Sequence, residues 1–156
     1  MTAYVDSSAL VAVYVAEQFS IAARRVLRSV AQAPFTLLHD LEVRNAFRLL
    51  AGRGLITKAE RRAVTANLDQ DLASQRLVHV ALDLPQVFTR ARELSEAYSE
   101  KILSRSLDVL HVAAALELSC SRFVSADDRQ LRLARAAGLK SIDITSTRSS
   151  AAPARR

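Results

Sequence analysis

The sequence predicts an α/β fold in which helices cover both faces of a parallel sheet. Short apolar runs alternate along the chain with longer segments of helical periodicity, the pattern of parallel sheets with covering helices. No two strand-like runs are joined by a tight hairpin turn, which favours crossover connections. The 156 residues include only three glycines and three prolines, too few for a turn-rich β-sandwich.

Five short apolar runs are predicted to form the strands, and seven helices are expected between and after them. Strands are expected at residues 2–6, 35–39, 77–83, 122–125 and 140–144. Helices are expected at residues 7–18, 19–33, 40–50, 57–75, 85–101, 106–119 and 127–137. Asp40 is the expected N-cap of the third helix, and Thr57 with Glu60 fits a capping box. Pro85 suits a first helical turn and Gly138 a helix end.

Length and composition indicate one folded domain, residues 1–145, followed by a disordered basic tail, residues 146–156. The tail holds three arginines and no acid, so +3 of the net charge of +6 belongs to it and +3 to the folded body. That balance favours polyanionic partners only mildly. No apolar run reaches the roughly 18 residues of a membrane span. The single cysteine, Cys120, excludes an internal disulfide. Together these observations predict a cytoplasmic protein that has no membrane partner.

Four carboxylates stand at or near the predicted helix starts: Asp6, Glu42, Asp108 and Asp127. Each has a structural explanation, because a carboxylate in the first turn of a helix caps free N–H groups and contributes roughly 0.5–2 kcal/mol. Capping explains Asp108 least well, since Ser106 could cap that helix instead. A charge among apolar neighbours also costs free energy unless it is paired.

Taken together, the carboxylates indicate a metal site. Asp6, Glu42 and Asp127 follow the first, second and fourth predicted strands, whose carboxyl ends share one edge of a parallel sheet. Converging carboxylates repel each other, and a divalent cation removes that penalty. Oxygen ligands without a nearby set of cysteines or histidines favour Mg²⁺ or Mn²⁺ over zinc. Such a site on a basic body suits phosphodiester hydrolysis.

The residues around these acids resemble the four sequence signatures of PIN-domain nucleases, most closely the VapC-type ribonuclease toxins of toxin–antitoxin pairs. The resemblance spans residues 2–144. The signatures are Asp6–Leu10 (DSSAL), Glu42–Ala46 (EVRNA), Leu107–Ala113 (LDVLHVA) and Phe123–Asp127 (FVSAD).

The resemblance implies a three-layer α/β/α fold with a central, mostly parallel sheet of about five strands. It also implies a metal-dependent endoribonuclease, using Mg²⁺ or Mn²⁺, that is the toxin of a type II pair, forms a homodimer and is inhibited by a VapB-like antitoxin. The catalytic and metal-binding acids, carried over by position, are Asp6, Glu42, Asp108 and Asp127. Ser8 and Ser125 become supporting hydroxyls, and Asp128 could share the role of Asp127 but is interpreted as a helix-capping residue.

Three further residues need an explanation, and two of them, His111 and Arg105, have more than one. His111 lies one helical turn after Asp108 and could form an Asp-x-x-His chelate, but without other histidine ligands a hydrogen-bonded core histidine is favoured. Arg105 could reach a phosphate or be solvated. His39, expected in a strand, is interpreted as structural.

Two other functions stay open from the sequence. One is a catalytically silent PIN-fold module that binds a protein or RNA. The other is phosphotransfer through an aspartyl-phosphate at Asp6, which would need a second carboxylate beside it. The neighbours are Ser7 and Ser8, which counts against phosphotransfer.

Overall fold

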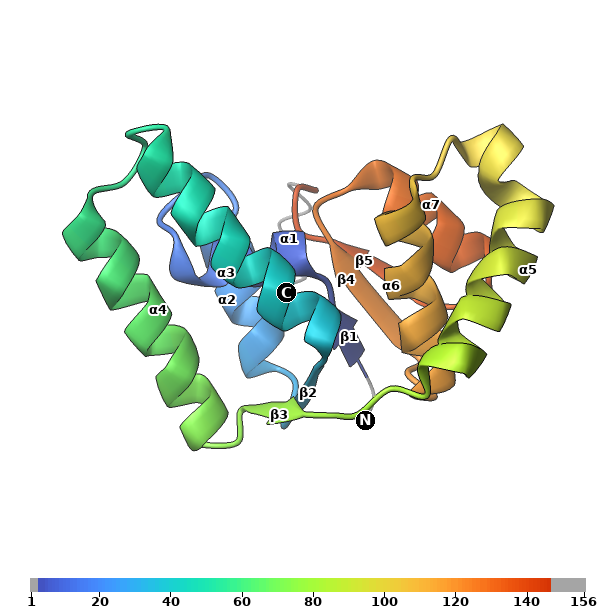
Figure 1. The fold of residues 1–156 in the computed structure, drawn as a ribbon, viewed down its shortest axis with the longest axis horizontal. Coiled ribbons are helices and arrows are strands. Elements are labelled where there is room, and N and C mark those ends of the chain that lie inside the picture. Colours follow the sequence, from blue (N-terminus) through green and yellow to red (C-terminus); the bar gives the residue numbers. More distant parts are fainter. Residues whose placement is uncertain (1–2, 147–156) are drawn as a thin grey trace, which may run out of the picture.

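The structure is a computed structural model that describes residues 3–146, and this part of the chain holds five strands and seven helices (Figure 1). The strands are β1 (Ala3–Val5), β2 (Ala33–Phe35), β3 (Leu77–His79), β4 (Arg122–Ser125) and β5 (Lys140–Asp143). The helices are α1 (Ser7–Tyr14), α2 (Ser20–Arg28), α3 (Leu37–Gly52), α4 (Lys58–Ala73), α5 (Leu84–Ile102), α6 (Ser106–Glu117) and α7 (Asp128–Ala136). The predicted α/β class is confirmed.

All five strands are parallel to their partners, but their hydrogen bonds divide them into two ladders. One ladder has the order β1-β4-β5 and the other pairs β2 with β3. The strands β1 and β2 lie side by side without forming a ladder. Ala33 donates its N–H toward β3, to Arg76, so the next nitrogen, that of Pro34, faces β1 and has no hydrogen to donate. The Val5 carbonyl accepts from His39 Nε2 instead, at 2.9 Å.

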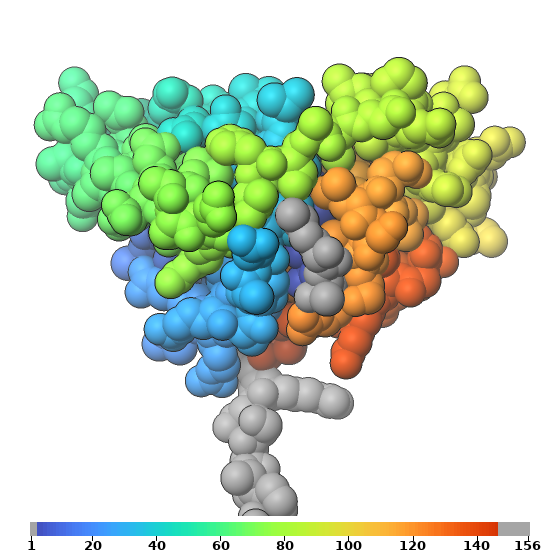
Figure 2. Space-filling model, turned by 90° about the horizontal axis from the view of Figure 1, so that it is seen from below, coloured from blue at the N-terminus to red at the C-terminus, as the bar shows by residue number. Residues whose placement is uncertain are grey.

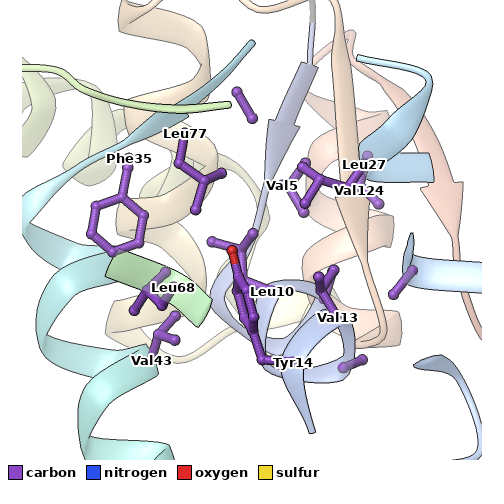
Figure 3. Packing of buried hydrophobic residues seen from close by; sticks show 14 of the residues in the cluster. Val5, Leu10, Val13, Tyr14, Leu27, Phe35, Val43, Leu68, Leu77 and Val124 are labelled. Carbon is purple, nitrogen blue, oxygen red and sulfur yellow. The ribbon is translucent and has the colours of Figure 1, made fainter. Parts of the chain in front are cut away.

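Successive residues of the central strands point into two separate hydrophobic clusters. Ala3, Val5 and Val124 belong to a cluster shared with the first four helices, and Figure 3 shows Val5 and Val124 in it. Tyr4 and Phe123 point the other way, into a cluster shared with α5, α6 and α7. This alternation is the period-2 geometry of a strand covered on both faces, so the fold has three layers.

The second strand and the third helix differ from the sequence prediction. The strand was expected at residues 35–39 and the helix from Asp40, but the strand ends at Phe35 and the helix begins at Leu37. Thr36, not Asp40, is the N-cap, and His39 completes a capping box: its Nδ1 accepts from the Thr36 N–H at 3.0 Å. A short apolar run does not distinguish a strand from a helix start by itself.

Other boundaries differ by a few residues. The first two helices are shorter than predicted and end at Tyr14 and Arg28, and β3 stops at His79 rather than at residue 83. The capping box of Thr57 and Glu60 is confirmed, as is Pro85 in the first turn of α5. Gly138 follows α7 with φ +89°, a conformation that favours glycine at a helix end.

The segment from β3 to the start of α5 passes across one face of the molecule, between α4 and α5 (Figure 2). No helix within residues 3–146 is long and apolar enough to span a membrane. The predicted basic tail lies outside the described residues, except for Ser146.

We expect Phe47→Ala to lower the free energy of unfolding by about 3–5 kcal/mol, because it empties a fully buried ring site. Phe47 has no exposed surface and meets Tyr14 edge-on, with 6.1 Å between ring centroids. Chemical denaturation measures the change. Leu55→Ala is the control, since Leu55 is 68% exposed and should shift stability by no more than about 0.5 kcal/mol. Equal effects of the two substitutions would contradict this packing.

Candidate functional site

Three of the four predicted acids line one pocket of about 500 Å³. Glu42, Asp108 and Asp127 reach it from α3, α6 and the start of α7. The other lining residues are Ser7, Ser8, Arg105, Ser106, Leu107, His111 and Gln130. The fourth acid, Asp6, is fully buried and bonded to one of the lining residues, Ser8, at 2.9 Å. The structure therefore brings all four carboxylates to one region.

Asp6 caps the helix that follows it and is held by three different donors. Its carboxylate accepts from the Ala9 N–H at 2.9 Å, from the Ser8 hydroxyl at 2.9 Å and from the Ser125 hydroxyl at 2.8 Å. Burial raises the pKa of Asp6, although His111 and these hydrogen bonds oppose the rise. Ser8 and Ser125 thus lie where the sequence placed supporting hydroxyls.

Glu42 is held by a buried histidine. It lies in the second turn of α3, not at the helix start as predicted, and accepts hydrogen bonds from Ser7 at 2.8 Å and from His111 Nε2. The other ring nitrogen of His111 meets the Tyr4 hydroxyl at 2.8 Å. Burial alone would raise the pKa of Glu42, but the hydrogen bond and charge of His111 and the Ser7 hydroxyl lower it below its usual value.

His111 is 1% exposed and hydrogen-bonded, in agreement with its interpretation as a core histidine. Its partners fix its orientation. Because the Glu42 carboxylate accepts hydrogen bonds, His111 Nε2 donates to it, and Nδ1 pairs with the Tyr4 hydroxyl. Since both nitrogens are occupied, the alternative Asp-x-x-His chelate with Asp108 is not formed in this structure.

Asp108 and Asp127 share two partners. The Arg105 guanidinium lies 3.5 Å from Asp108 and 3.8 Å from Asp127. Gln130 donates to Asp108 from its side chain at 3.2 Å and to Asp127 from its backbone N–H at 3.3 Å. A second guanidinium, that of Arg129, is 3.6 Å from Asp127. The positive charges of the arginines reduce the repulsion between these two carboxylates.

Asp127 is the N-cap of α7. The helix-capping role that the sequence analysis gave to Asp128 therefore belongs to Asp127. The Asp128 side chain is 77% exposed, lies 3.9 Å from Arg132 and does not line the pocket.

The sequence did not reveal Gln130, Ser7 or Tyr4 as parts of the site. Gln130 lies three residues after Asp127 and outside the four signatures, and Ser7 lies inside the signature Asp6–Leu10, where the resemblance gave it no role. The Tyr4 hydroxyl meets a residue 107 positions away, a contact that periodicity does not encode.

The donor set suits a hard cation, because it consists of carboxylate and hydroxyl oxygens together with an amide oxygen. Within residues 3–146, however, no group of three or more His, Cys, Asp or Glu side chains is arranged to hold a metal ion. Each carboxylate has protein partners instead: hydroxyls for Asp6, His111 for Glu42 and arginines for Asp108 and Asp127.

Fold and pocket together define an α/β protein with an acidic, arginine-flanked site at the carboxyl ends of parallel strands. The family model for the PIN domain matches residues 3–136, and the chain belongs to the PIN domain family. PIN domains are generally nucleases. The resemblance noted in the sequence is thereby confirmed at the level of the family.

A solved structure described as FitAcB from Neisseria gonorrhoeae has a similar fold. The TM-score is 0.65 with 11% sequence identity, and the alignment covers 92% of this chain and 99% of that chain. At this identity the likeness concerns the fold alone. No curated protein matches the sequence.

Replacing the buried charge at Asp6 should make stability less dependent on pH. Because the folded state raises the pKa of Asp6 above its ordinary value of 3.8, the folded protein binds more protons than the unfolded chain above that pH. The parent therefore loses stability as the pH rises through the interval between the two pKa values, and Asp6→Asn does not.

We expect the melting temperature of Asp6→Asn, relative to the parent, to rise between pH 4 and pH 7 when both are measured in EDTA. Asp83→Asn is the control: Asp83 is an exposed N-cap, and asparagine caps equally well. A constant difference between parent and Asp6→Asn across this range would contradict the burial of a charged Asp6.

Proposed function

We propose that the protein is a metal-dependent endoribonuclease and the toxin of a type II toxin–antitoxin pair, as the VapC-type resemblance implies. The observation that carries this proposal is the meeting of Glu42, Asp108 and Asp127 in one pocket, with Asp6 bonded to Ser8 of its lining, in a chain of the PIN domain family. These four residues are the proposed catalytic and metal-binding acids. The proposed cation is Mg²⁺ or Mn²⁺.

When bound, such a cation activates water and neutralises charge that develops on a phosphodiester. The chain's own residues have two other tasks. Ser8, Ser125 and His111 fix the orientations of Asp6 and Glu42 through the hydrogen bonds described above. Arg105, whose side chain is 67% exposed at the pocket, supplies positive charge for the neighbouring RNA phosphates.

The proposed partners are RNA, a VapB-like antitoxin and a second copy of the chain, all in the cytoplasm. Exposed apolar residues on α3 and in the pocket lining support a protein partner. Leu37 and Leu41 are 67% and 71% exposed one helical turn apart on α3, and Leu107 lines the pocket. Exposed apolar side chains near a functional site are typical of interaction surfaces.

Asp108→Asn should abolish RNA cleavage, because it removes the charge of a buried carboxylate in the pocket with little change in side-chain size. Cleavage of a mixture of structured RNAs in Mg²⁺ or Mn²⁺ measures the activity, and circular dichroism checks that the fold is kept. Asp83→Asn, at a residue that does not line the pocket, is the matched control and should retain activity. Full activity of pure Asp108→Asn, or parent activity that persists in EDTA, would contradict the proposed mechanism.

The second candidate is a catalytically silent module that binds RNA or protein. It is favoured by one observation: in the described part of the chain each of the four acids already has a protein partner, and no three of them form a metal site. This module predicts that the parent binds RNA but cleaves none of the tested RNAs at any Mn²⁺ concentration. Cleavage that requires Mn²⁺ and all four acids would exclude it.

A further inference from the structure

Gln130 stands out in the pocket because half of its amide has no partner. The residue lies in the first turn of α7, lines the pocket and is 8% exposed. Its nitrogen donates to Asp108 Oδ1 at 3.2 Å. Its oxygen, Oε1, is buried and makes no hydrogen bond to any residue that the structure describes.

The orientation of this amide follows from its neighbour. An ionised carboxylate only accepts hydrogen bonds, so the amide nitrogen must face Asp108 and the oxygen must face away from it. Rotating the amide by 180° would place two acceptors against each other. The unpartnered Oε1 is therefore a consequence of the contact with Asp108.

A role in packing alone does not explain an unpartnered oxygen. A leucine or methionine would fill similar space without leaving a buried acceptor, which costs free energy when it has no donor. A glutamate would add a third negative charge beside Asp108 and Asp127, which Gln130 also contacts through its backbone. Glutamine supplies an acceptor there without that charge.

We propose that Gln130 is a positioning residue of the site with two functions. Its Nε2 fixes the orientation of Asp108, and its Oε1 accepts a hydrogen bond from the hydration shell of the divalent cation. This inference rests on the cation proposed above. It adds to the four acids a neutral side chain that contributes to cation affinity from outside the carboxylate set, as hydrogen-bonding partners around metal ligands generally do.

The test is calorimetric titration of Mn²⁺ into the full-length parent, Gln130→Leu and Gln130→Met, with thermal unfolding of each in EDTA. We expect the Mn²⁺ affinity of both variants to fall about 10- to 100-fold. The melting temperature in EDTA should change little, because removal of the unpartnered Oε1 offsets the loss of the hydrogen bond to Asp108. Gln70→Leu, on the exposed face of α4, should change neither quantity. Gln130→Met allows the same measurements if Gln130→Leu does not fold.

The outcomes separate this inference from the proposed function. Parent-like Mn²⁺ affinity in a folded Gln130 variant overturns the role of Gln130 and leaves the proposed cation in place. A lower melting temperature with unchanged affinity also overturns it, since that is the result of a structural role alone. A parent that binds no Mn²⁺ overturns the cation proposal and the role of Gln130 together.

Discussion

A carboxylate without solvent exposure, at the end of the first strand, organises both the fold and the site. Asp6 caps α1 and accepts from Ser125 at the end of β4, so one side chain joins two strand–helix units. The Ser125 hydroxyl also accepts from the Asp127 N–H at 2.9 Å. The position of Asp127 at the start of α7 therefore depends on the same hydroxyl that holds Asp6. Burying a charge in this way is tolerable only when several donors satisfy it.

The remaining acids are satisfied by chemically different partners. Glu42 receives hydrogen bonds from a histidine and a hydroxyl, whereas Asp108 and Asp127 face guanidinium groups and the amide of Gln130. His111 is itself fixed by Tyr4 in the middle of β1, which stacks on Phe123 of β4. Tyr4 thus connects the core of the sheet to the pocket, because its ring packs on Phe123 and its hydroxyl contacts His111. Because each acid has partners of its own, the four acidic residues can lie close together, as is typical of functional sites.

The sequence predicted elements well where local signals agreed. The bounds of β4 were predicted to the residue because the apolar pair Phe123 and Val124 stands between polar residues and shortly before two aspartates. The capping box of α4 has its usual Thr and Glu. Prediction failed around residue 36, where a histidine takes the place of the acidic residue in the capping box. The four acids could be named from short motifs. Gln130 and Tyr4 could not, because their roles depend on contacts between helices and strands distant in sequence.

Pro34 leaves the two strand ladders joined at β1 and β2 by side chains, including the bond from His39 to Val5, rather than by a backbone ladder. Glu42 extends from α3, which follows β2, on one side of this junction. Asp6, Asp108 and Asp127 come from elements attached to the other ladder. Sliding or widening along this seam would move Glu42 relative to the other three acids while leaving their mutual spacing intact. The spacing of the complete acidic set therefore depends on the boundary between β1 and β2, which side-chain contacts hold in place.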